Sequence, residues 1–324
     1  MKTKPLIAVC ALLLLLGCAE EKSRPRNEAP RSEPGTMSSI VIPPFHGQEA
    51  FRFLTAQTDL GPRNPGSKGH DRCLAYLEQT LVRLADTVRL QPFTHAGYDG
   101  ATLQLTNIIA SFKPESPARV LLCAHWDTRP RADRDENPRR RNEPITGAND
   151  GASGVAVLLQ LATLLKTHPP TIGVDIVLFD GEDYGLEGDT GNYLLGSRHF
   201  ASTASRAVVP RFGILLDMVG DAALELPREG YSVRYAPDVV NLIWATARGL
   251  GITEFVDFLG GEIIDDHLPL NEVGIRTVDI IDFDYPDPTH RYWHTHQDTP
   301  DKCSPESLEA VGTVITHVVY NERP

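Results

Sequence analysis

The chain of 324 residues has few aromatic residues, few cysteines and a deficit of positive charge. Phe, Trp and Tyr make up 7% of it, five residues are Cys, and 31 Lys and Arg stand against 43 Asp and Glu, a formal net charge of -12. This acidic excess gives nucleic-acid phosphates no electrostatic reason to bind, so we expect no nucleic-acid partner. With 41% hydrophobic and 23% charged residues, the composition is globular and excludes a disordered, collagen-like or multi-span membrane chain.

A long apolar run occurs at the N-terminus. Lys2 and Lys4 precede apolar residues 5–16, and Gly17 and Cys18 follow. Basic, apolar and small-residue segments in this order are typical of a secretory signal, and the run is too short to span a bilayer as a mature helix. A small residue directly before Cys resembles a bacterial lipoprotein box, in which the thiol is acylated. A plain signal peptide with an incidental cysteine is the alternative.

These features predict three parts of the chain. We expect residues 1–17 to be a lipoprotein signal peptide and the exported protein to be anchored by lipid on Cys18 to a bacterial membrane, on the periplasmic side. Residues 18–44, rich in Glu, Arg, Pro and Ser, predict a disordered tether. Residues 45–324 then form a single folded domain.

The remaining cysteines allow few further predictions about disulfides or metal sites. Cys10 leaves with the signal and Cys18 would carry the lipid, so Cys73, Cys123 and Cys303 remain for an oxidising compartment. Three thiols allow one disulfide or none. Their spacing matches no zinc or redox motif.

Helix and strand patterns alternate from residue 45 onwards. Helices are predicted over residues 48–60, 69–86, 150–166, 196–205, 238–250 and 304–320. Strands are predicted over residues 87–93, 103–112, 118–124, 174–179, 212–216 and 277–281. This order is typical of an α/β fold with a mostly parallel central sheet and helices on both faces. Residues 127–146 form a loop too long for an ordinary connection, and we expect it to have a function.

Polar residues follow the predicted strands at the points where the strands end. In such sheets ligands bind beyond the carboxyl ends of the strands, so these residues are best considered together. They are His125, Asp127, Asn149, Asp150, Asp180, Glu182, Asp183 and Asp217, with Asp265, Asp266, His267, Trp293 and His294 further along.

Each of these residues alone has a structural explanation. Asp150 could cap a helix, Asp217 could form a turn, and His294 could lie on the surface. However, several carboxylates converging at one end of a sheet repel one another unless a cation lies among them. Zinc accepts mixed imidazole and carboxylate ligands in a four-coordinate shell. A metal site therefore accounts for the whole set.

The sequence resembles the co-catalytic zinc aminopeptidases and their relatives, the glutaminyl-peptide cyclotransferases (glutaminyl cyclases), which implies a zinc aminopeptidase-like α/β/α sandwich. The matching stretches occur in family order within residues 45–320. They are Gly61-Pro62-Arg63 with Gly66-Ser67, residues 125–130 (HWDTRP), 147–154 (GANDGASG), 179–183 (FDGED), 196–199 (GSRH), 216–217 (LD), 265–267 (DDH) and 293–295 (WHT). The Glu182-Asp183 pair, where aminopeptidases usually carry Glu-Glu, and Trp293 directly before His294 resemble the bacterial cyclase branch.

The resemblance implies Asp150, Asp183 and His294 as zinc ligands. Two carboxylates and one imidazole leave a fourth position open, as a catalytic zinc requires. His125 and Asp217 match the ligands of a second metal in the aminopeptidases, whereas family cyclases keep these residue types with a single zinc. We therefore expect one zinc ion, or two if the protein is an aminopeptidase.

The implied reaction is cyclisation of an N-terminal glutamine to pyroglutamate with release of ammonia, so the expected partners are peptide or protein N-termini bearing glutamine. Glu182 would carry a proton from the amine to the departing ammonia, helped by Asp217 and Asp266. Trp293 would form an apolar wall beside the site, with plain core packing as its alternative. The rival functions are a di-zinc aminopeptidase and a catalytically inactive, lipid-anchored binding protein. The full ligand set argues against the inactive protein.

Overall fold

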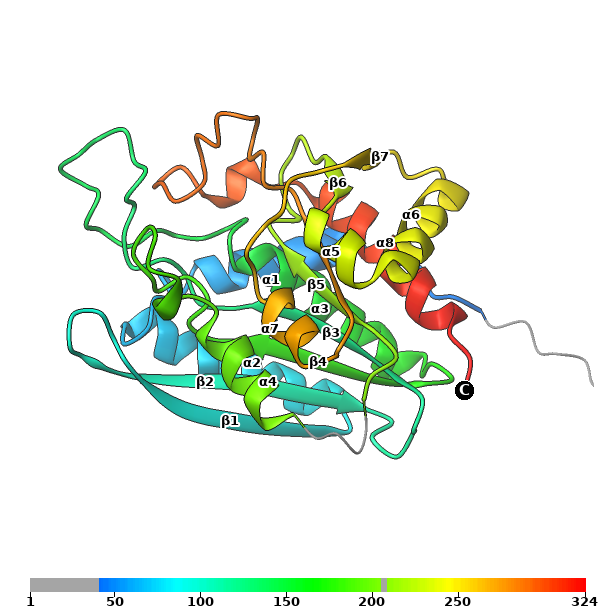
Figure 1. The fold of residues 1–324 in the computed structure, drawn as a ribbon. Coiled ribbons are helices and arrows are strands. Elements are labelled where there is room, and N and C mark those ends of the chain that lie inside the picture. The colour runs from blue at the N-terminus through cyan, green and yellow to red at the C-terminus, as the bar shows by residue number, and fades with distance from the viewer. Residues whose placement is uncertain (1–40, 205–208) are drawn as a thin grey trace, which may run out of the picture. The chain divides into compact units, whose positions relative to one another are not determined.

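A six-stranded sheet forms the centre of the computed structural model, which describes residues 41–204 and 209–324 (Figure 1). The strands are β1 (Thr87–Ala96), β2 (Thr102–Phe112), β3 (Arg119–His125), β4 (Gly173–Phe179), β5 (Gly213–Asp217) and β8 (Thr277–Ile281), in the order β1-β2-β4-β3-β5-β8. Strands β4, β3, β5 and β8 are parallel, and β1 and β2 form an antiparallel edge. The predicted mostly parallel sheet is confirmed.

Helices cover both faces of this sheet (Figure 1). The larger core contains side chains of α1 (Gly47–Thr58), α2 (Lys68–Leu84), α3 (Ala152–Thr167), α6 (Pro237–Leu250) and α8 (Pro305–Asn321). Helices α4 (Leu195–Thr203) and α7 (His267–Glu272) pack on the other face. Because β3 is covered on both faces, all seven of its residues are buried, as its unbroken apolar run predicts.

Several short elements are not predicted by the sequence patterns. These are the two-stranded sheet of β6 (Leu226–Arg228) and β7 (Phe255–Leu259), helices α5 (Gly230–Tyr235) and α7, and the 3-10 turns η1 (Thr190–Asn192) and η2 (Pro300–Lys302). Proline is unfavourable inside strands and helices, and Pro227 lies in β6 and Pro269 in α7. Contacts with the rest of the fold, rather than local propensity, stabilise such elements.

The start of α3 differs from the prediction in a way that affects the site. The helix begins at Ala152 rather than at Asp150, because Gly151 adopts a φ of 94°, a conformation that favours glycine. A Cβ atom at Gly151 would also lie 2.4 Å from the carbonyl oxygen of Asp127. Asp150 therefore lies in the turn before the helix. Helix α4 ends at Thr203, and Ser205, the last residue of the predicted helix, lies outside the described residues.

The predicted signal peptide, Cys18 and most of the predicted tether lie outside the described residues. Of residues 41–44, Pro43 is buried against the domain. Within the described ranges, no helix has both the length and the apolar character needed to cross a membrane. Cys73, Cys123 and Cys303 are all buried and free.

Candidate metal centre and active site

The carboxyl ends of three parallel strands place the central side chains of the site. His125 is the last residue of β3 and Asp217 the last residue of β5, while Glu182 and Asp183 lie in the turn after β4. Because β3 and β4 are parallel, with His125 opposite Phe179, the residues that follow both strands reach the same edge of the sheet.

A first group of three buried residues consists of Asp150, Asp183 and His294. His294 Nε2 lies 3.5 Å from Asp150 Oδ2 and 3.4 Å from Asp183 Oδ1. One ligand atom of each residue lies within 4.8 Å of those of the other two. The sequence separates His294 from Asp183 by a large part of the domain, and the fold brings them together.

The chemistry of this first group fits a zinc ion. Burial, together with the charges of Arg129 and Arg134, lowers the pKa of His294 well below its usual value, so the ring is neutral and has a lone pair for a metal. Burial raises the pKa of Asp183 well above its usual value, and Asp183 Oδ2 has no hydrogen-bond partner. A cation between these carboxylates would relieve both penalties. Mixed carboxylate and imidazole ligands suit zinc.

A second group shares Asp150 with the first and adds His125 and Asp217. His125 Nε2 lies 3.3 Å from Asp150 Oδ1 and 3.1 Å from Asp217 Oδ1, and these three residues also offer ligand atoms within 4.8 Å of one another. Asp150 therefore faces one histidine with each of its oxygens. This is the arrangement that a carboxylate bridging two metal ions would need.

Glu182 belongs to neither group but lines a cavity that Asp150, Asp183 and His294 also line. The lining of this cavity, here called the central cavity, consists of Asp150, Glu182, Asp183, Tyr193, Asp217, Met218, Ile263, Ile264, Asp265, Ile281, Phe283, Trp293 and His294. Burial and the negative charge of Asp183 raise the pKa of Glu182 well above its usual value. A raised pKa makes the carboxylate a stronger base, which favours its use as a proton carrier.

The remaining predicted site residues occupy different positions around the central cavity. Trp293 lines it, and its ring stacks on that of His294 with 3.8 Å between the centroids. Asp217 lines it directly, whereas Asp266 is fully buried outside the lining. Burial raises the pKa of Asp266 to about 7. Asp265, to which the sequence assigns no role, lines the cavity where Asp266 does not.

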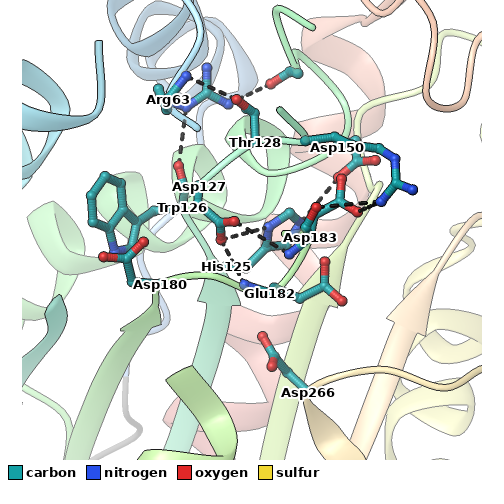
Figure 2. Close-up of polar contacts among 12 residues, drawn as sticks. Arg63, His125, Trp126, Asp127, Thr128, Asp150, Asp180, Glu182, Asp183 and Asp266 are labelled. Carbon is teal, nitrogen blue, oxygen red and sulfur yellow. Dashed lines mark hydrogen bonds and ion pairs between the residues drawn. The ribbon is translucent and has the colours of Figure 1, made fainter. Parts of the chain in front are cut away.

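Two buried aspartates hold the ligand-bearing turns in place, and the sequence assigns no role to either. Asp127 accepts hydrogen bonds from the backbone N–H groups of Glu182 and Asp183, at 3.0 and 3.3 Å. Its carboxylate also lies 3.6 Å from His125 Nδ1 (Figure 2). Asp298 accepts the N–H group of Asp150 at 3.2 Å. Such partners orient metal ligands. The proximity of Asp127 to His125 in the sequence is a signal for its role, whereas Asp298 is too distant from Asp150 to give one.

Arg63 also helps to fix the turn that carries Asp150. This side chain is fully buried, and its guanidinium donates hydrogen bonds to the carbonyl oxygens of Trp126 at 3.1 Å and Gly147 at 2.6 Å. Its backbone N–H donates to Thr128 Oγ1 (Figure 2). The early Gly61-Pro62-Arg63 stretch therefore links the segment that follows His125 to the segment that leads to Asp150.

Comparison with known proteins identifies the family of the chain. Residues 107–319 match the family described as Peptidase family M28. The chain belongs to this family. A glutaminyl cyclase from Bacteroides thetaiotaomicron, solved with N-acetylhistamine bound, is 40% identical with a TM-score of 0.84, over 87% of this chain and 100% of that chain. The expected family and fold are thus confirmed.

Other M28 relatives carry peptidase names. A Zn-dependent exopeptidase structure from Parabacteroides distasonis is 37% identical with a TM-score of 0.83, over 87% of this chain and 100% of that chain. Aminopeptidase YwaD of Bacillus subtilis is 30% identical over 247 residues, which are 72% of this chain. The match covers 47% of that aminopeptidase, about half of its length.

Proposed function

We propose that the protein is a zinc-dependent glutaminyl-peptide cyclotransferase, which converts the N-terminal glutamine of peptides to pyroglutamate and releases ammonia. The observation that supports this most is the 40% identity to a bacterial glutaminyl cyclase over that chain's whole length. The position of Glu182 beside the first ligand group agrees with it, because the reaction needs a proton carrier next to the metal.

Asp150, Asp183 and His294 would hold the zinc ion. When bound there, zinc polarises the γ-amide carbonyl of the glutamine side chain. The three ligands come from the turn before α3, the turn after β4 and the segment between β8 and η2. Asp127 and Asp298 fix two of these segments through backbone hydrogen bonds.

Glu182 moves the proton that the reaction requires. The substrate's α-ammonium group first releases one proton to solvent. As the neutral amine attacks the γ-carbonyl carbon of the same residue, the Glu182 carboxylate takes a second proton from the amine nitrogen. A bond from the amine nitrogen to this carbon forms, and the bond to the amide nitrogen breaks. Glu182 returns the proton to that nitrogen, which leaves as ammonia. The charges of Asp265 and Asp266 also help to raise the pKa of Glu182.

The other lining residues bind the substrate. Trp293, Tyr193 and Ile264 line both the central cavity and the cavity beside it with apolar surface and would exclude water from the reacting amine. Asp217 also lines the central cavity and pairs with His125. A free amine on the substrate would meet a cavity rich in carboxylates, which suits its positive charge.

An aminopeptidase is the second candidate function, and one observation favours it. His125, Asp150 and Asp217 form a complete second ligand group that shares Asp150 with the first. With two zinc ions bound, Glu182 would accept a proton from a water molecule that attacks the first peptide bond. The two functions predict different products from the same peptide.

A peptide with a blocked amine tests the proposed cyclisation. Zinc-loaded protein should release ammonia from a peptide that begins with glutamine and none from the same peptide carrying an acetyl group on the glutamine nitrogen, because the α-amine is the nucleophile. Ammonia release from the acetylated peptide, or from neither peptide, would contradict the proposal.

A further inference from the structure

A second cavity lies next to the central cavity, on the side of β6 and β7. It is here called the acidic cavity. Its lining consists of Glu225, Pro227, Glu229, Phe258, Leu259, Gly260, Gly261, Ile263, Ile281, Asp282, Phe283, Asp284 and His290. Ile263, Ile281 and Phe283 line both cavities. A cavity of about 510 Å³ is within the usual size range of ligand pockets.

Three carboxylates of the acidic cavity lack a Lys or Arg partner. No Lys or Arg side chain of residues 41–204 or 209–324 forms an ion pair with Glu225, Asp282 or Asp284. Asp284 lies 3.9 Å from His290, and Asp282 accepts a hydrogen bond from the backbone N–H of Glu225 at 2.9 Å. The fourth acid, Glu229, is already used, because it caps α5 through the N–H groups of Tyr231 and Ser232.

Acidic side chains next to this cavity are paired in the usual way. Asp257 lies 2.7 Å from Arg228, and Glu262 pairs with Arg234. The unpaired carboxylates are therefore a local feature of the cavity and not only a result of the chain's net charge. Asp282 is 2% exposed, and burial raises its pKa to about 7. A cation that entered the cavity would stabilise its ionised form.

The acidic cavity also has apolar walls. Phe258 and Leu259 are 51% and 67% exposed, which is unusual for large hydrophobic side chains, and Phe283 completes the wall towards the central cavity. Lysine and arginine side chains combine an apolar stem with a charged end, and they bind where apolar surface and carboxylates adjoin.

The cavity on the other side of the central cavity has a different charge pattern. It is lined by Arg129, Asp133, Arg134 and Glu187 among others. Its basic groups are paired, with Arg134 lying 3.0 Å from Glu187 and Arg129 bound to Asp133 and Asp183. Of these two neighbouring cavities in the described part of the chain, the acidic cavity is therefore the one whose carboxylates lack a Lys or Arg partner.

We propose that the acidic cavity binds a lysine or arginine side chain of the substrate, carried by one of the two residues that follow the N-terminal glutamine. This inference rests on the proposed cyclase function and names the peptides that the site prefers. Each residue of an extended peptide advances about 3.5 Å, so the second or third residue is the one that reaches a neighbouring cavity. Glu225 and Asp284 are the specificity-determining residues, with the apolar stem lying on Phe258.

A peptide series tests this preference. Gln-Lys-Ala, Gln-Ala-Lys, Gln-Ala-Ala and Gln-Ala-Glu amides are compared by kcat/KM for ammonia release. At least one lysine peptide should exceed Gln-Ala-Ala by about five-fold, which corresponds to one partly exposed ion pair. The glutamate peptide should be the poorest substrate, and added salt should reduce all of these differences.

Two variants test whether the lysine preference depends on the acidic cavity. In the double variant Glu225→Gln with Asp284→Asn, the ratio of the lysine peptide to Gln-Ala-Ala should fall to about one, because both exposed carboxylates are lost. Glu115→Gln removes one exposed charge from the loop between β2 and β3, at the opposite end of β3, and should keep the full ratio.

The outcomes distinguish a failure of the proposed cyclase function from a failure of the inference about the acidic cavity. If no peptide of the series is cyclised, the proposed function fails and the inference fails with it. If all four are cyclised at equal rates, or if the lysine preference survives in the double variant, the acidic cavity does not bind the cation and only the inference fails. A preference for the glutamate peptide would place the following residues near Arg134 instead.

Discussion

Arg129 Nη1 donates a hydrogen bond to Asp183 Oδ1 across 2.7 Å, and the two side chains are only 1% and 2% exposed. The same guanidinium binds Asp133. A buried cation beside a candidate zinc ligand offsets part of its negative charge and fixes the orientation of the carboxylate. Arg129 therefore supports the candidate metal centre without belonging to either ligand group.

Removal of this guanidinium should weaken zinc binding. In Arg129→Gln we expect a loss of about 10- to 100-fold in zinc affinity, measured by competition with a chelator, and a loss of about 3 kcal/mol in the free energy of unfolding, because Asp183 stays buried without its partner. Arg276→Gln, which breaks an exposed pair with Asp238, is the control and should change neither. Unchanged zinc affinity in Arg129→Gln would show that Arg129 does not orient the ligand.

Substitutions in each of the two ligand groups show how many metal ions the protein binds. Asp183→Ala should abolish zinc binding in the first group, whereas Asp301→Ala, an exposed aspartate in η2, should retain the parental zinc content. His125→Ala should leave zinc content near the parental value in a one-zinc cyclase and should halve it in a two-zinc peptidase. Elemental analysis gives the stoichiometry. Full zinc content in Asp183→Ala would remove Asp183 from the ligand set.

Glu182 should be essential for turnover but not for metal binding. Glu182→Gln keeps the shape of the side chain but cannot carry the proton, so kcat should fall by roughly two to four orders of magnitude. Zinc content should stay at the parental level, because Glu182 belongs to neither ligand group. Parental turnover would refute the proton-carrier role, and loss of zinc would make Glu182 a ligand.

Glu229 should make the stability of the fold depend on pH. Burial alone would raise its pKa, but the pairing with His267 at 3.3 Å and the hydrogen bonds from Ser232 and from the backbone N–H of Ile263 outweigh this and lower the pKa from 4.5 to about 2. A lowered carboxyl pKa adds stability above the unfolded value, and this contribution is lost as the pH falls from about 4.5 towards 2. Glu229→Gln should cost about 2 kcal/mol at neutral pH.

Urea unfolding of the parent protein and of Glu229→Gln at several pH values checks this. The difference in unfolding free energy between them should be constant at neutral pH and should shrink below about pH 4.5. A difference that is independent of pH down to about pH 3 would mean that Glu229 acts only through packing and neutral hydrogen bonds.

The lipid anchor remains a prediction from the sequence. Cys18→Ser should abolish acylation and release the protein into the soluble fraction of its host, while Cys73→Ser, at a buried free cysteine of the domain, should leave the lipid in place. Mass spectrometry of the native N-terminus checks this. An unlipidated parent protein would indicate a plain signal peptide.

The sequence predicts the sheet well where burial leaves a strong pattern. The apolar run before His125 predicts β3 because strands covered on both faces need apolar residues at every position. Glu182 and Asp183 are also predictable, because they come directly after the buried strand β4, whereas the roles of Asp150 and His294 are implied only by the family resemblance. Patterns fail for β6, which is only three residues long and contains Pro227, and which is stabilised by pairing with the distant strand β7.

The supporting residues of the site are harder to predict than its centre. Asp298 acts on the backbone of Asp150, and Arg129 acts on Asp183. In both cases the partner is distant in sequence, and only the folded chain makes the contact. Asp265 and Asp266 are neighbours with the same chemistry, and the local helix geometry before α7 decides which of them lines the central cavity. No periodicity in the sequence carries that information.

Mass spectrometry of a glutaminyl peptide after incubation with the zinc-loaded protein tests the central claim most directly. The peptide should begin with glutamine, and its second residue should be one that an aminopeptidase could also remove. If the protein is a cyclotransferase, the peptide loses one molecule of ammonia and keeps all of its residues, and Glu182→Gln abolishes this change. A peptide that instead loses its whole N-terminal residue, with no ammonia-loss product, would contradict the account and identify an aminopeptidase.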